Sequence, residues 1–132
     1  MRDIKFRYRI KSLIGYIIIK ILNIEDIESG NSFLNECFKF NWQILSRDEF
    51  TGLKDKNGKE IYEGDIVKML DEWIDHYILY SNHQIEFGSG TFRLENGVSL
   101  HDCLSENDDF EKCELEVIGN VWENPELLKE IK

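Results

Sequence analysis

The sequence contains no alanine and only one proline, and these shortages favour one class of secondary structure. Alanine is the best helix former, whereas β-branched and aromatic residues favour strands. Isoleucine is abundant, and aromatic residues make up 12% of the 132 residues. With 42% hydrophobic residues the chain can bury a core, which excludes wholly disordered or fibrous classes. Composition therefore predicts a mainly β protein of one domain or two small lobes.

Cysteine is also scarce, and the three that occur, Cys37, Cys103 and Cys113, form an odd set without paired spacing. This pattern argues against a disulfide framework and favours a reducing cytosol. The basic start of the chain and the apolar run at residues 13–19 imitate a secretion signal. Lys20 interrupts the run, however, and no small-residue cleavage site follows it. No stretch approaches the length of a membrane span, so we expect a cytoplasmic protein without a membrane segment.

Motifs of catalysis and metal binding are missing as well. The sequence has no phosphate-binding glycine loop and no nucleophile elbow. No CxxC or HExxH spacing joins the cysteines to His76, His83 and His101, and the acidic residues at 102–111 lack the spacing of a calcium loop. Glu63-Gly64-Asp65 is interpreted as a turn in which Asp65 hydrogen-bonds nearby backbone. We therefore expect no enzymatic activity, no cofactor and no metal.

Charge is distributed unevenly along the chain, whose formal net charge is −10. Residues 1–50 carry eight basic against seven acidic residues, whereas residues 51–132 carry eight against nineteen. The acidic half argues against a protein that binds nucleic acid over its whole surface, because phosphate affinity comes from basic groups. Only the N-terminal part is left as a surface for an anionic partner.

Alternation of apolar and basic residues at 4–11 predicts a half-buried strand. Its basic face consists of Lys5, Arg7, Arg9 and Lys11. The isoleucine-rich segment at 13–24 favours a strand, although a helical stripe also fits it. Residues 33–40 fit a short helix or a strand, and residues 42–45 a further strand.

A second block begins near Phe50, and its turns are marked by glycine. Asn57-Gly58 supplies the positive φ angles of a tight hairpin. Further strands are predicted at 66–69, 77–80, 85–87 and 91–94, and a last one from Leu115 to Val121. Asn124-Pro125 predicts a short terminal helix over 125–131. Short strands with frequent turns are typical of a small barrel or sandwich.

Three segments together resemble a known family. Residues 50–67 (FTGLKDKNGKEIYEGDIV) are closely similar to the central motif of the YopX family of phage and prophage proteins. The opening MRDIKFR and residues 115–128 (LEVIGNVWENPELL) resemble that family's two ends. The positions that carry the resemblance are Thr51, Gly52, Leu53, Asp55, Asn57, Gly58, Tyr62, Glu63, Gly64, Asp65, Val67, Gly119, Asn120, Asn124 and Pro125.

The resemblance implies an N-terminal α+β lobe at residues 1–49. It also implies a small SH3-like β-barrel with a short C-terminal helix at residues 50–132. It implies a phage or prophage setting in a bacterial cytoplasm, and no enzymatic activity that could be assigned to particular residues.

Two functions from different classes remain open. The first is a non-enzymatic module that assembles with itself or docks on a host or phage protein, with Trp73 as an exposed loop candidate for contact. The second is a nucleic-acid-related role, either phosphate binding by the basic strand face or acidic mimicry of nucleic acid against a host protein. Alternatively, the basic face lies against acidic groups of the same or a neighbouring subunit.

The charge difference between the two halves, together with the apolar segment at 13–22, predicts a homo-oligomer. Opposite patches can steer copies into head-to-tail contact. A lobe of about fifty residues can scarcely bury such a segment by itself. We expect the contacts to lie within residues 1–50 and to weaken on charge reversal at Arg7 and Arg9.

Overall fold

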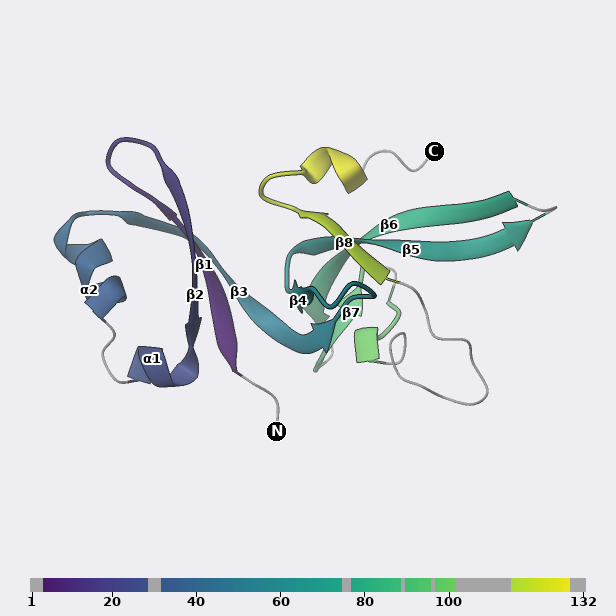
Figure 1. Cartoon of the computed structure of the whole chain (residues 1–132), viewed down its shortest axis with the longest axis horizontal. Helices are drawn as coiled ribbons and strands as arrows, with labels where there is room; N and C mark the ends of the chain where they lie inside the picture. The colour runs from purple at the N-terminus through teal and green to yellow at the C-terminus, as the bar shows by residue number, and fades with distance from the viewer. Residues whose placement is uncertain are drawn as a thin grey trace. The chain divides into compact units, whose positions relative to one another are not determined.

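The computed structural model describes residues 4–28, 32–74, 77–88, 90–95, 97–101 and 115–128 (Figure 1). The side chains of residues 32, 34, 70–74 and 77–80 lie outside that description. The chain divides into two compact units, Met1–Gly52 and Leu53–Lys132. The described strands form two four-stranded antiparallel sheets, which confirms the mainly β prediction. Closure of the C-terminal strands into a barrel stays a prediction.

The first unit is built on three antiparallel strands. β1 (Lys5–Lys11) is the central strand and pairs with β2 (Ile17–Asn23) on one side and β3 (Gln43–Lys54) on the other. The strand predicted from the alternation at the start of the chain is confirmed, and so is the strand in the isoleucine-rich segment. β3 is longer than the four-residue strand predicted there, because it continues through Phe50 into the second unit.

Two short helices, α1 (Ile24–Glu28) and α2 (Ser32–Lys39), lie to one side of these strands (Figure 1). The ambiguous segment at 33–40 is therefore helical. The small core of the unit consists of Tyr8, Ile10, Leu22 and Cys37. Its side chains come from one face of β1 and β2 and from α2, so the helices cover the apolar face that the alternation in β1 creates.

The second unit begins with the predicted hairpin. Asp55 N donates to the carbonyl of Lys59 (2.8 Å), and Gly58 N donates back to the carbonyl of Asp55 (3.0 Å). Gly58 has a φ of 81°, as a tight reversal between twisted strands requires. The turn leads into β4 (Glu60–Tyr62), which lies next to β3, and the second turn at Glu63-Gly64 leads into β5 (Asp65–Ile74).

The second sheet has the order β7-β6-β5-β8. β6 (Tyr77–Gly88) lies between β5 and β7 (Thr91–Leu94), and β8 (Leu115–Asn120) covers the other side of β5. The core of this unit is larger than that of the first. It consists of Ile61, Val67, Ile85, Phe92, Leu94, Leu100 and Leu115.

Several strand boundaries were wrong. The strands predicted at 77–80 and 85–87 are one continuous strand, β6, and β5 extends to Ile74 instead of ending at Met69. The backbones of β5 and β6 pair with each other beyond the apolar patterns, in a register that sets Trp73 opposite Ile78. Trp73 therefore lies in a strand and not on a loop. Its side chain is outside the described part.

The C-terminal segment also differs from expectation. β8 ends at Asn120, so Val121 lies in the turn that follows. The terminal helix is a 3₁₀ turn, η1 (Pro125–Leu128), closed by Leu127 N donating to the carbonyl of Asn124 (3.1 Å). Asn82 Nδ2 donates to the carbonyl of Leu127 (3.0 Å) and thus ties η1 to β6. The rest of the predicted helix, residues 129–131, lies outside the described residues.

Candidate interaction surface

Exposed apolar side chains are concentrated in the first unit. Among the described side chains, eleven of the fourteen large hydrophobic residues that are exposed belong to it. They are Ile4, Leu13, Ile14, Tyr16, Ile17, Ile19, Ile21, Phe38, Phe40, Ile44 and Leu45. We call them the exposed apolar set. Apolar side chains gathered in this way on a small unit are typical of surfaces that bind another protein.

The tip of the β1–β2 hairpin carries two of the three most exposed members of this set. Leu13 and Ile14 are 72% and 79% exposed. They lie in a turn held by Gly15 N donating to the Ser12 carbonyl (3.1 Å) and by Tyr16 N donating to Ser12 Oγ (3.1 Å). The backbone of the tip is thus well bonded although its side chains are open to solvent.

A shallow apolar cavity lies beside the tip. It has a volume of about 370 Å³ and is lined by Ser12, Leu13, Ile14, Tyr16, Ile18 and Trp42. Aliphatic and aromatic side chains form most of this lining, so the cavity offers mainly apolar contact.

An isoleucine row runs along β2. Ile17, Ile19 and Ile21 lie opposite Lys11, Arg9 and Arg7 of β1, so they share the face of the sheet that carries the basic residues. Each of the three is nearly half exposed. Leu22, which points to the other face, is buried in the core with Tyr8. The row is therefore an apolar stripe on the face of β2 opposite the core.

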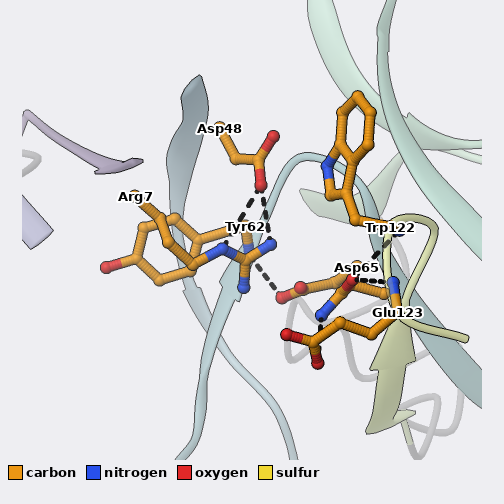
Figure 2. A network of polar contacts seen from close by, with 7 residues as sticks. Arg7, Asp48, Tyr62, Asp65, Trp122 and Glu123 are labelled. Carbon is orange, nitrogen blue, oxygen red and sulfur yellow. Dashed lines mark hydrogen bonds and ion pairs between the residues drawn. The ribbon is translucent and has the colours of Figure 1, made fainter. Parts of the chain in front are cut away.

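The basic face of β1 is mostly occupied within the unit. Arg7 donates to Asp48 Oδ2 through Nη2 (2.9 Å) and Nε (3.3 Å), as Figure 2 shows. The register explains the pair, because Arg7 lies opposite Asp48 on β3. Arg9 is only 6% exposed. The prediction of an open basic face is thus wrong for these two residues, and for Arg7 the alternative of an acidic partner in the same chain is confirmed.

The two lysines of that face differ from the arginines. Lys5 Nζ lies 4.6 Å from the centre of the Phe50 ring, a cation–π contact. Lys11 is exposed at the end of β1. The alternating sequence did not reveal that β3 would place a carboxylate opposite the strand, because a register between distant segments is not encoded locally.

Asp55 braces the family-like hairpin. Its Oδ1 accepts hydrogen bonds from Asn57 N and Lys59 N, both at 2.9 Å, and its Oδ2 accepts one from Val117 N of β8 at 2.9 Å. Burial on its own would raise the pKa of this carboxyl. The three backbone donors and the charge of Lys59 outweigh burial, and the pKa lies below its usual value. The residue therefore stabilises structure as a carboxylate.

The second turn of the central motif has the same character. Asp65 is buried, and its Oδ2 accepts a hydrogen bond from Tyr62 N (2.8 Å; Figure 2). Gly64 has a φ of 87°, donates to the Ile85 carbonyl (2.8 Å) and accepts from Val121 N (2.9 Å). The interpretation of this motif as a turn is confirmed. Glu63 lies between these residues in the same turn.

Asn120 organises the turn after β8. Its Oδ1 accepts hydrogen bonds from Trp122 N (3.0 Å) and Glu123 N (2.9 Å). A side chain at Gly119 would collide with Asn124, whose Oδ1 lies 2.5 Å from the position of a Cβ. The bonds from Val117 to Asp55 and from Val121 to Gly64 join the middle and end motifs. Trp122, the second residue of this turn, is half exposed.

The remaining positions of the central motif are structural too. Thr51 is buried at the end of the first unit, and Gly52 follows it with a φ of 87°. Leu53 packs against the core of the second unit, and Val67 is fully buried within it. Pro125 is the first residue of η1. These positions thus form turns, braces and core, and none of them opens onto a described cavity.

A polar triad whose serine and histidine are buried was not predicted. His83 Nδ1 lies 2.8 Å from Glu95 Oε1, and His83 Nε2 lies 2.6 Å from Ser81 Oγ. The carboxylate can only accept, which places a proton on Nδ1 and lets Nε2 accept from the serine hydroxyl. The order of atoms is that of a serine hydrolase triad, but Ser81 is 6% exposed and its Oγ is closed to a substrate. The i, i+2 spacing of serine and histidine was visible in the sequence, whereas the approach of Glu95 depends on the β6–β7 register.

Cys37 is the one free cysteine in the described part, and it is buried. Burial raises the pKa of its thiol, and the negative charge of Glu36 adds to the effect, so the thiol is a core group and not a nucleophile. Within the described ranges no three His, Cys, Asp or Glu side chains gather in a way that could hold a metal ion. His76, Cys103, Cys113 and the acidic segment at 102–111 lie outside those ranges.

None of the helices in the described segments is long and apolar enough to cross a membrane. Among solved structures, the crystal structure of protein EF1440 from Enterococcus faecalis is similar to this chain, with 25% sequence identity and a TM-score of 0.51. The similarity covers 97% of this chain and 99% of that one. No curated protein matches the sequence. The family model described as YopX protein matches residues 11–129, nearly the whole chain, and the protein therefore belongs to the YopX family.

Proposed function

We propose that this protein is a non-enzymatic interaction module that assembles with itself through its N-terminal unit. The observation that carries the proposal is the concentration of the exposed apolar set in the first unit. Burying such side chains against a second protein surface releases water and is the usual driving force of association. The second unit acts as a stable scaffold, and residues 50–132 are proposed to form an SH3-like barrel.

Enzymatic chemistry finds little support in the described residues. Asp55 and Asp65, the buried carboxylates of the family motif, both accept hydrogen bonds from backbone amides. The Ser81–His83–Glu95 triad is closed to solvent at its hydroxyl. A role without catalysis, cofactor or bound metal accords with these sites.

The first form of the nucleic-acid alternative, phosphate binding by the basic strand face, is disfavoured by the positions of its arginines. Phosphate binding requires accessible cations that release counterions. Arg7 is paired with Asp48 and Arg9 is buried, so the strand face offers far less charge than its sequence indicates. Family membership supports a phage or prophage protein that acts in the bacterial cytoplasm, where another copy or a host or phage protein is the partner.

The proposal is tested by the mass of the intact protein in moderate salt. We expect light scattering at micromolar concentration to give a mass above that of the 15.7 kDa chain. A double variant at the hairpin tip, Leu13→Ser with Ile14→Ser, removes two of the most exposed apolar side chains and should lower that mass toward the monomer.

The matched control is Phe87→Ser with Val98→Ser, which removes two exposed apolar side chains from the second unit. This variant should assemble as the wild type does. A wild-type protein that stays at 15.7 kDa throughout would overturn self-assembly, and a loss of mass caused only by the control pair would move the contact to the second unit.

A further inference from the structure

β2 is an edge strand. It pairs with β1 on one side, and no described strand pairs with its other side. Natural edge strands are usually protected by proline, bulges or several charges. β2 contains no proline, its pairing with β1 has no register shift, and Lys20 is its single charged residue. The edge therefore lacks most of the devices that prevent pairing with another strand.

The hydrogen-bonding direction of each β2 residue follows from the two ends of the hairpin. Ser12 N donates to the Tyr16 carbonyl (2.9 Å), and Ile24 N donates to the Ile4 carbonyl (2.8 Å). In an antiparallel ladder the bonded pairs alternate, so the even-numbered residues of β2 bond to β1. The amides and carbonyls of the odd-numbered residues 17, 19, 21 and 23 consequently point to the open edge.

We propose that β2 pairs antiparallel with β2 of a second copy, with Ile19 opposite Ile19 of that copy. This inference rests on the proposed self-assembly and specifies its contact. The pairing joins the β2-β1-β3-β4 sheets of two copies across a two-fold axis through the centre of the row. Ile17 then lies opposite Ile21 of the other copy, so the isoleucine rows of both copies meet on one face and bury each other.

Charge selects this register among the symmetric ones. A two-fold axis in an antiparallel pair passes through one residue and its copy, so the centre is Ile18, Ile19, Lys20 or Ile21. A centre at Lys20 places two ammonium groups directly opposite each other, which is unfavourable. Centring at Ile18 leaves one isoleucine of each row without an isoleucine opposite it, and centring at Ile21 leaves two. Only the centre at Ile19 places an isoleucine opposite each of the three isoleucines in the row. This centre also sets Lys20 opposite Ile18 of the second copy.

The same register accounts for the hairpin tip. Continuing it along the strands sets Tyr16 opposite Leu22 of the second copy, so the tip reaches the far end of the other β2. Tyr16 is exposed in the single chain, as are Leu13 and Ile14 beside it. Pairing of β2 therefore brings the most exposed residues of the tip against the second copy.

Charge exchange at the centre tests the register. Ile19→Lys alone and Ile19→Glu alone should each weaken the dimer about a hundredfold or more, because two apolar contacts are replaced by directly opposed like charges. Mixing the two variants in equal amounts should restore a heterodimer, since an ammonium then faces a carboxylate. Sedimentation velocity with one variant fluorescently labelled measures the recovery, and circular dichroism checks that each variant keeps its fold.

A matched pair of mixtures separates this register from general charge attraction. Ile17→Lys mixed with Ile21→Glu should associate, because residues 17 and 21 of different copies are opposite each other. Ile17→Lys mixed with Ile17→Glu carries the same charges but sets each against an isoleucine. It should associate at least about tenfold more weakly.

The outcomes distinguish this inference from the proposed function. A wild-type protein that is monomeric overturns both. Association of the wild type without recovery in the Ile19 mixture overturns the β2 register and leaves self-assembly through other apolar residues standing. Equal association of the two Ile17 mixtures also contradicts the register.

Discussion

The two units of the chain differ in how completely they hide their apolar side chains. The second unit has a core of seven buried residues, and its motif carboxylate Asp55 accepts three hydrogen bonds from backbone amides. The first unit has a core of four buried residues and carries most of the exposed apolar set. A small unit buries a smaller fraction of its surface, so the first unit gains the most from contact with another molecule.

The segments of the sequence that identify the family differ from those that supply the exposed apolar residues. Residues 50–67 and 115–128, two of the three segments that resemble the YopX family, mostly build the closed and internally braced unit. The apolar residues that are available for contact lie elsewhere. The family motif therefore identifies a scaffold, and the interaction surface has to be sought outside it.

Removing the arginine of the buried ion pair should produce the largest change. Arg7→Ala leaves the buried Asp48 carboxylate without its guanidinium and should destabilise the first unit by about 3 kcal/mol. The double variant Arg7→Leu with Asp48→Leu should recover most of that loss. Chemical denaturation measures both, with Lys11→Ala as an exposed control. Equal stability of Arg7→Ala and the control would show that the pair contributes nothing.

Asp55→Asn should have the next largest effect, now in the second unit. An amide replaces a carboxylate that accepts three backbone hydrogen bonds, which should cost about 2 kcal/mol. Because the folded pKa of Asp55 lies below the ordinary 3.8, its contribution is complete above that pH and is lost as the pH falls through the folded pKa.

Stability curves between about pH 7 and pH 2 measure this contribution. The wild type should lose it in acid, whereas Asp55→Asn lacks it at every pH and shows a shallower decline below about pH 4. Parallel curves for the two proteins would contradict the brace.

Gly58→Val should weaken the second unit by about 1.5 kcal/mol. The φ of 81° at this position strains a β-branched residue, although no neighbouring atom lies within 4 Å of an added Cβ. The penalty is therefore one of backbone conformation. Thermal melts compare this variant with Lys54→Val, an exposed strand position that should show no loss. A wild-type melting temperature for Gly58→Val would mean that the turn is assigned incorrectly.

The smallest effect on stability is expected for Phe38→Ser. This side chain is 74% exposed, so its loss should change the free energy of unfolding of the isolated chain by less than about 0.5 kcal/mol. A larger destabilisation, measured at a concentration low enough to keep the chain monomeric, would show that Phe38 belongs to the core. The first unit would then be better closed than its exposed side chains indicate.

Local features of the fold could be predicted from the sequence because local rules determine them. The alternation in β1, the glycine turns at 58 and 64 and the carboxylate of Asp65 all act within a few residues. The lengths of β5 and β6 could not be predicted in this way. Polar residues such as Asp71 and Asn82 ended the apolar pattern, while cross-strand hydrogen bonds continue the strands past them.

The contact residues were predicted less well than the turns. The sequence indicated apolar surface at 13–22 but also an open basic face, and the structure removes Arg7 and Arg9 from that face. Pairing of Arg7 with Asp48 depends on the register between β1 and β3, which are far apart in the chain. Long-range register likewise hid the Ser81–His83–Glu95 triad.

Hydrogen exchange of the intact chain, followed by mass spectrometry at several protein concentrations, tests the difference between the units most directly. The account predicts that peptides covering residues 12–23 gain protection as the concentration rises, whereas peptides covering residues 53–74 exchange at a constant rate. Protection that rises with concentration in the second unit, or in neither unit, would contradict it.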